Sequence, residues 1–238
     1  MTAVDSPSGT TSPGGILGSR MLRREDPALL TGEARFVADL SVPGALHISI
    51  VRSPVAHARI RSVDLSAATS MPGVVAAFSG ADLESEWAGP LPCAWSVTPD
   101  MKSPRHLPVA VDKVCYAGDA VAVIVARSEY EAHDAADAVV IDFDPLPPVL
   151  GIEEAASDAV VIHEDLATNR SYTWELSPDP AAVGKAFAEA AHTVSARFVH
   201  QRLIPSAMET RGVLVVPQPF GGDFTVYSAT TEAGKSSE

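Results

Sequence analysis

The 238-residue chain lacks several features that would place it in an exported or membrane class. It contains two cysteines, Cys93 and Cys115, which are too few for a disulfide scaffold and too far apart for a Cys-x-x-Cys motif. A reducing compartment, the cytoplasm, is therefore expected. No apolar run approaches the roughly 18 residues that a membrane helix needs, and the N-terminus has neither a basic start nor an apolar signal core. We therefore expect neither a membrane anchor nor export.

Basic residues are also scarce. The chain has 17 Lys and Arg against 30 Asp and Glu, which gives a formal net charge of −13. Nucleic acids and anionic membranes both bind positive surfaces, so neither is expected as a partner. Solubility is the simpler explanation of the acidic excess. The hydrophobic share of 46% is enough to bury a substantial core in one large or two small domains.

Motifs that carry catalysis are missing as well, since the chain has no Walker-type phosphate loop and no recognisable nucleophile motif. His192 and His200 are eight residues apart, with no carboxylate placed to complete a metal site. No carboxylate or cysteine accompanies His57, so we expect a histidine that is satisfied by backbone groups rather than a catalytic one. The acids Asp142, Asp144, Glu153 and Glu154 indicate a solvated edge. We assign no catalytic, cofactor-binding or metal-binding residue.

The most informative stretch is residues 114–148. Residues 120–126 are continuously apolar and rich in β-branched side chains, which predicts a strand covered on both faces. Ser128 stands at an N-cap position with Glu131 three residues later, so a helix is expected over residues 129–138. A second strand is expected over residues 139–143, ended by the prolines that follow. These elements predict a strand–helix–strand unit in an α/β layer.

Shorter elements are predicted on both sides of this unit. Before it we expect a disordered leader over residues 1–17 and a helical turn over residues 27–30 that ends at Gly32. Strands are expected over residues 36–39, 45–51, 59–64 and 74–78. A brief helix is expected over residues 66–71 and a long loop over residues 84–112. Leu46, Ile48 and Ile50 alternate on one face of their strand. A loop as long as residues 84–112 is usually a lid or a docking arm, and Trp87 and Trp95 favour contact with another surface.

Beyond the central unit, residues 151–178 form a predicted connector. Asp179 followed by Pro180 predicts the start of a helix that runs to residue 191. Period-two alternation then predicts three antiparallel strands, over residues 192–201, 213–216 and 224–227. Glu209 is the one carboxylate expected in a buried, oriented position, either in an ion pair with Arg211 or in a pocket wall.

Several short motifs follow one another along nearly the whole chain, and together they suggest a family. They are Arg23-Arg24-Glu25-Asp26, Leu30-Thr31-Gly32-Glu33-Ala34-Arg35-Phe36-Val37-Ala38-Asp39, Arg52-Ser53-Pro54 with His57-Ala58, Pro72-Gly73-Val74, Tyr116-Ala117-Gly118-Asp119, Pro145-Leu146-Pro147, and Gln201-Arg202 with Pro205 and Met208-Glu209-Thr210-Arg211-Gly212. In order and spacing the set resembles the molybdopterin-binding large subunit of the molybdenum hydroxylases, the xanthine dehydrogenase, aldehyde oxidase and carbon monoxide dehydrogenase group.

This resemblance implies an α+β fold. Residues 18–150 would be an α/β hammerhead domain, and residues 179–238 would be the first strands of an incomplete molybdopterin-binding domain. It implies an oxidoreductase that hydroxylates an aldehyde, a purine or a similar carbon, or that oxidises carbon monoxide. Such an enzyme uses a molybdenum–molybdopterin cofactor and passes electrons to iron–sulfur and FAD subunits.

The chain also departs from the family pattern. It has no Gly-Gly-Gly-Phe-Gly loop and no late glutamate base, and Thr231 stands where the family's Ser/Ala-Thr-Gln run has glutamine. We therefore expect a truncated or frameshifted chain that binds no cofactor and is inactive alone. Its partners would be the remaining part of the large subunit and the iron–sulfur and FAD subunits. The alternative is a stand-alone interaction or assembly module of a split subunit.

Self-association is a further expectation from the C-terminal region. Its apolar face lacks the cover that a continuing domain would supply, and exposed apolar faces with open strand edges associate. The residues on that face are Phe198, Leu203, Val213, Val215 and Val226.

Overall fold

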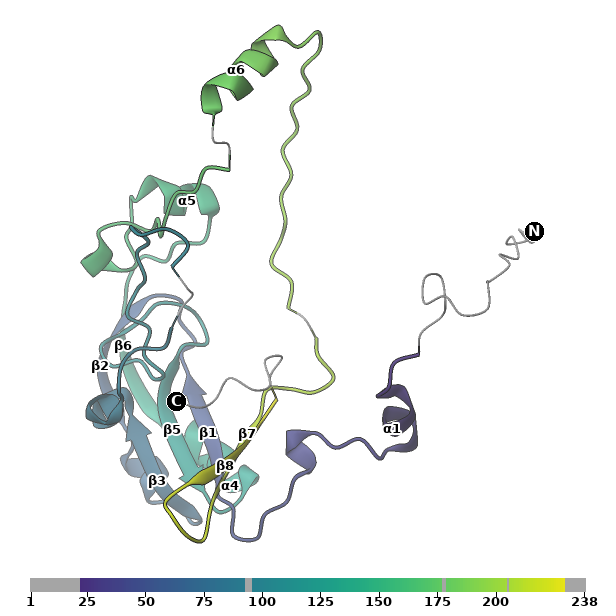
Figure 1. The fold of residues 1–238 in the computed structure, drawn as a ribbon. Helices are drawn as coiled ribbons and strands as arrows, with labels where there is room; N and C mark the ends of the chain where they lie inside the picture. The colour runs from purple at the N-terminus through teal and green to yellow at the C-terminus, as the bar shows by residue number, and fades with distance from the viewer. Residues whose placement is uncertain (1–21, 93–95, 177–178, 205, 230–238) are drawn as a thin grey trace, which may run out of the picture. The chain divides into compact units, whose positions relative to one another are not determined.

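The computed structural model describes residues 22–92, 96–176, 179–204 and 206–229 (Figure 1). The predicted leader at residues 1–17 and Trp95 lie outside the described residues. The chain divides into a larger unit, Gly44–His200, and a smaller unit made of Met1–Pro43 and Gln201–Glu238. In the part of the chain that the structure describes, no helix has the length and apolar character to cross a membrane.

The larger unit is built around strand β5 (Ala120–Ala126), which lies between β1 (His47–Arg52) and β3 (Val74–Ser79) in an antiparallel sheet. Val121 and Ile124 point to opposite faces of β5 and both are fully buried, which confirms the predicted strand. Ile124 packs with Ala135 of helix α4 (Glu129–Asp137) and with Ala68 of helix α2 (Ser66–Thr69). The helices therefore cover one face of this sheet.

A second antiparallel sheet has strand β2 (Ala58–Asp64) between β4 (Lys113–Val114) and β6 (Val140–Pro145). Ala58 and Val114 of this sheet pack with Val121 of β5, so the two sheets share a core. The prediction of a single strand–helix–strand layer is wrong in one respect. Strands β5 and β6 flank α4 in sequence but belong to different sheets, because each finds an antiparallel partner elsewhere in the chain.

The predicted capping of the helices is confirmed at both long helices. The Ser128 hydroxyl accepts a hydrogen bond from the Glu131 backbone N–H at 3.3 Å and donates one to the Glu131 carboxylate at 2.9 Å. The Asp179 carboxylate accepts from the Ala182 N–H at 3.0 Å and begins α6 (Pro180–Glu189). Each cap satisfies a donor that has no partner within the helix.

The remaining short elements also follow the predicted order. Helix α1 (Asp26–Thr31) ends at Gly32, whose φ of 74° is accessible to glycine at little cost. The described part of the long loop at residues 84–112 includes a 3-10 helix, η2 (Glu84–Glu86). The other helical elements of the larger unit are α3 (Gly80–Leu83), α5 (Ile152–Ser157) and η3 (Glu164–Leu166). The predicted connector thus contains helical turns of its own.

Two predicted strands are wrong. Residues 36–39 form a 3-10 turn, η1 (Val37–Asp39), because the Asp39 carboxylate accepts from the Phe36 N–H at 2.9 Å and closes the chain on itself. Residues 192–201 are extended but pair with no described strand. The last two predicted strands are confirmed as the hairpin of β7 (Val213–Pro217) and β8 (Phe224–Ser228).

The apolar alternation of β1 has an unexpected environment. Ile48 and Ile50 share the face of Val123 and Val125, to which they are paired, but Ile48 is 66% exposed. Ser49, on the opposite face, is only 6% exposed and lies under α4, where its hydroxyl is 3.3 Å from His133 Nδ1. The sheet therefore has one face covered by helices and one apolar face that other described residues cover only in part.

Candidate functional site

Two of the motif segments meet at the turn that precedes β5. The Arg52 guanidinium donates to the Gly118 carbonyl at 2.9 Å. The Gly118 N–H donates to the Ser53 carbonyl at 2.8 Å, and the Ser53 N–H donates to the Asp119 carbonyl at 2.8 Å. These bonds join the end of β1 to the start of β5, so the motif residues position the central strand.

Asp119 and His57 are, with Ser53, the buried polar residues of these motif segments. The Asp119 carboxylate accepts from the Cys115 N–H at 3.1 Å, across a turn in which Gly118 has a φ of 94°. His57 is 4% exposed, and its Nδ1 donates to the Pro147 carbonyl at 2.8 Å. The Leu146 N–H donates to the His57 carbonyl at 2.9 Å. This confirms the prediction of a histidine held by backbone groups, although its Nε2 has no partner among the described residues.

Two further motif segments meet in the smaller unit. The Glu209 carboxylate accepts from the Val37 N–H at 3.0 Å, across 172 residues of sequence. Gly212 lies against Val37 so closely that an added Cβ would be 3.3 Å from its Cγ1. The expected ion pair between Glu209 and Arg211 is not among those that the described residues form. The oriented role predicted for Glu209 is therefore met by a backbone donor instead.

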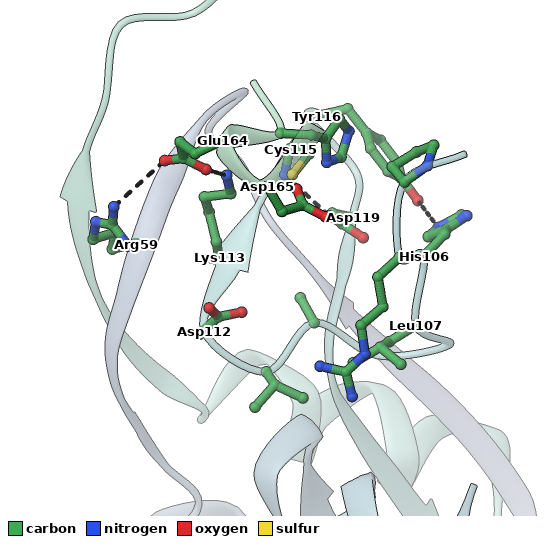
Figure 2. Close-up of a pocket in the computed structure, with 15 residues that line it drawn as sticks. Arg59, His106, Leu107, Asp112, Lys113, Cys115, Tyr116, Asp119, Glu164 and Asp165 are labelled. Atoms are coloured by element: carbon green, nitrogen blue, oxygen red, sulfur yellow. Dashed lines mark hydrogen bonds and ion pairs between the residues drawn. The ribbon is translucent and has the colours of Figure 1, made fainter. Parts of the chain in front are cut away.

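A cavity of about 390 Å³ opens beside β4 in the larger unit (Figure 2). It lies where the long loop and the connector meet the second sheet. The polar residues that line it are Arg59, Arg105, His106, Asp112, Lys113, Cys115, Tyr116, Asp119, His163, Glu164 and Asp165. It is the strongest candidate for a binding site in the described part of the chain.

The basic groups of this cavity are already paired. The Lys113 ammonium donates to the Glu164 carboxylate and to the Ile162 carbonyl, and Arg59 lies 3.4 Å from the same carboxylate. Figure 2 shows Glu164 bridging the two cations. The hydrogen bond from Lys113 lowers the pKa of Glu164 below its ordinary value. Because the positive charge is locally neutralised, the cavity has little attraction for an anion.

Burial shifts the pKa of three further groups of the cavity, Cys115, Tyr116 and His163. Burial raises the pKa of the Cys115 thiol, which disfavours the reactive thiolate. Burial also raises the pKa of Tyr116, whose hydroxyl is 3.4 Å from His106 Nε2. Burial lowers the pKa of His163, which keeps its imidazole uncharged. The cavity thus offers hydrogen-bonding groups and paired charges rather than an activated nucleophile.

Asn169 holds the connector together and had no sequence signal. Its side-chain NH₂ donates to the Val160 carbonyl at 2.7 Å, and its side-chain oxygen accepts from the Ile162 N–H at 2.9 Å. The Asn169 N–H donates to the Asp158 carboxylate at 2.7 Å, which lowers the pKa of that acid. These contacts place Ile162 and Glu164 beside Lys113. Because Asn169 bonds residues seven to fourteen positions away, no helical or strand period reveals it.

Among the described residues, no group of three or more His, Cys, Asp or Glu side chains is placed to hold a metal ion. The cavity beside β4 is lined by residues up to Asp165, and the side chains of residues 191–204 are exposed.

Two family models match the chain in consecutive segments. The a/b hammerhead domain of aldehyde oxidase and xanthine dehydrogenase matches residues 31–147, and the molybdopterin cofactor-binding domain matches residues 162–235. The chain belongs to the molybdenum hydroxylase large-subunit family. The resemblance drawn from the motifs and the expected α+β hammerhead fold are both confirmed.

Individual relatives agree with this assignment. The chain is 35% identical to the carbon monoxide dehydrogenase large chain of Hydrogenophaga pseudoflava, over 87% of this chain and 26% of that one. It is 36% identical to the nicotine 6-hydroxylase large subunit of Paenarthrobacter nicotinovorans, over 84% of this chain and 24% of that one. The solved quinoline 2-oxidoreductase of Pseudomonas putida 86 aligns with a TM-score of 0.77 at 34% identity, over 90% of this chain and 27% of that chain.

The chain thus matches the N-terminal part of these large subunits and spans about a quarter of the length of the relatives. The matched segments include every motif junction described above. The motif residues at these junctions contribute to the fold, because they form hydrogen bonds with backbone groups of other segments.

Proposed function

We propose that this chain supplies the hammerhead part of a molybdopterin-dependent hydroxylase. The observation that carries the proposal is the consecutive match to the hammerhead and cofactor-binding models within one chain. Its role would be structural. The two sheets and the motif junctions would hold the long loop and the connector in fixed positions, against which the rest of a large subunit is completed.

The oxidoreductase activity would require further residues of the cofactor-binding domain, in the same or in a second polypeptide. The partial coverage of the relatives supports this, because the chain matches only about a quarter of their length. The cofactor, when bound to a complete domain, supplies the redox chemistry. The family resemblance adds iron–sulfur and FAD subunits as electron-transfer partners, and the low cysteine count favours a cytoplasmic location.

Metal analysis tests this proposal. The free chain is compared with a chimera that joins residues 1–238 to the part of the Hydrogenophaga pseudoflava large chain outside the matched segment. The native Hydrogenophaga large chain, expressed in the same host, shows whether that host loads the cofactor. We expect molybdenum and pterin in the chimera and neither in the free chain. Stoichiometric molybdenum in the free chain, or a folded chimera without it, would overturn the proposal.

A stand-alone interaction module is the second candidate. It is favoured by the partly uncovered apolar face of the first sheet, where Ile48, Ile50 and Phe78 are exposed. A module of this kind would associate with itself or with a partner that lacks molybdenum. Sedimentation velocity distinguishes it, since a concentration-dependent dimer of the free chain supports the module and a monomer supports the hammerhead role.

A further inference from the structure

Each Lys and Arg side chain that lines the cavity beside β4 has a carboxylate partner. Lys113 and Arg59 both pair with Glu164. Arg105 pairs with Glu84, which lies outside the lining, at 2.7 Å. An acidic ligand would therefore have to displace a carboxylate that is already bound to these cations.

Two other carboxylates of the lining are free. Asp112 comes directly before Lys113 of β4, and Asp165 lies in η3. Neither carboxylate forms a hydrogen bond or an ion pair with another described residue. Figure 2 shows the two side chains at separate places along the cavity wall. The lining thus has unused acceptors and a free negative charge, which favours a ligand that brings N–H donors and a positive charge.

His57 supplies a third unused acceptor behind this wall. Arg59 and Lys113 are paired between β2 and β4 and line the cavity from one side of the second sheet. The ladder extends to His57, whose carbonyl accepts from the Leu146 N–H, so its side chain lies on the same side as that of Arg59. Its Nδ1 donates to the Pro147 carbonyl, which leaves Nε2 as a buried acceptor without a partner among the described residues. An N–H from a ligand, or a water molecule held beneath it, would satisfy this nitrogen.

The rest of the lining suits a small apolar body. The rings of His106 and Tyr116 lie edge to face, with centroids 6.1 Å apart and an interplanar angle of 81°. The apolar residues of the lining are Pro104, Leu107, Ala110 and Val111. The volume of about 390 Å³ is near the lower end of the range for ligand pockets, so the ligand is small.

We propose that the cavity beside β4 is a binding site for a small organic cation, an alkyl amine or a guanidine. Asp112 and Asp165 would bind its charged group, and the apolar residues of the lining would contact its alkyl part. The site is separate from the proposed structural role, because it needs neither the cofactor nor the rest of a large subunit.

Titration of the full chain followed by nuclear magnetic resonance tests this site. The probes are putrescine and agmatine, and butanediol with the same carbon chain as putrescine is the uncharged control. We expect both amines at about 1 mM or less to shift the amide signals of residues 112–119 and 163–165, and butanediol to leave them unchanged. Butanediol that binds as well as putrescine, or amine-induced shifts spread evenly over the chain, would overturn the proposal.

Three matched substitutions separate the site from general attraction to an acidic chain. Asp112→Asn and Asp165→Asn should each raise the dissociation constant of putrescine by about three- to tenfold, because each removes a charged acceptor in a partly solvated cavity. Asp134→Asn removes the same charge from an exposed position on α4, outside the lining, and should leave the constant unchanged.

Thermal unfolding checks that the three variants are folded, since all three aspartates are exposed. Equal weakening of binding by the three substitutions would assign it to the net charge of −13 and overturn the proposal. Absence of binding to the folded full chain would do the same.

Discussion

Residues 120–126 and 193–199 are both seven residues long and each has four β-branched or aromatic side chains, yet only the first is a strand of the chain. Since their intrinsic preferences are similar, the difference lies in their surroundings. Strand β5 has β1 and β3 on its two edges and buried residues on both faces. Residues 193–199 have neither. Strand preference therefore describes how well a segment fits a sheet, and the sheet must be supplied by other residues.

The largest predicted effect is the replacement of a buried valine in β5. Val121→Asp should lower the free energy of unfolding of the larger unit by about 3–5 kcal/mol, because it buries an unpaired charge. The same change at exposed Val194 should cost less than about 0.5 kcal/mol. Denaturant unfolding followed by circular dichroism measures both. Equal decreases in the free energy of unfolding for Val121→Asp and Val194→Asp would contradict the difference in burial between the two segments.

A second prediction concerns the contact that replaces the expected ion pair. Glu209→Ala leaves the Val37 N–H without its acceptor and should reduce the local stability of that amide by about 1–2 kcal/mol. Glu209→Gln keeps an oxygen at the same position and is the control. Amide exchange at Val37 is the measurement. An unchanged rate in the alanine variant would show that the contact does not stabilise the smaller unit.

The helix cap gives a third and smaller effect. Ser128→Ala removes the acceptor for the Glu131 N–H and should cost about 1 kcal/mol in the larger unit. Ser195→Ala makes the same chemical change in residues 193–199, where the described structure shows no hydrogen bond from the hydroxyl. The unfolding temperature of the Ser128→Ala variant should therefore be lower than that of the Ser195→Ala variant. If Ser128→Ala does not change the unfolding temperature, the stability of α4 comes from its packing on the sheet rather than from the cap.

The smallest effect is a dependence on pH. Because burial lowers the pKa of His163, the unfolded chain binds a proton more readily than the folded one. Stability from this group is complete above the ordinary pKa of 6.5 and falls as the pH drops through the lower folded value. Since the ring is partly solvated, we expect about 0.5 kcal/mol or less. His163→Gln should remove this part of the slope between pH 8 and pH 5, and His192→Gln should not.

Much of the fold was predictable because its signals are local. The continuous apolar run of β5 and the Ser128 and Asp179 caps each depend on residues within a few positions of one another. The predicted bounds of these helices and of the C-terminal hairpin agree with the structure to within a few residues. The family followed from the order of the motifs, which needs no contact information.

The wrong predictions depend largely on non-local contacts. Residues 36–39 form a turn that is closed locally, because the Phe36 N–H donates to Asp39, and is held by the distant Glu209, which accepts from the Val37 N–H. The separation of β5 and β6 into different sheets depends on which distant strands pair with them. The cavity beside β4 was missed for the same reason, since Lys113 and Glu164 meet only after Asn169 has fixed the connector.

The most direct test of this account is one exchange experiment on the free chain at a concentration where it is monomeric. The account predicts strong protection for amides of β5 and rates near those of an unstructured peptide for residues 193–199. Comparable protection in the two segments would contradict it. Such a result would mean that residues 193–199 have a partner within this chain.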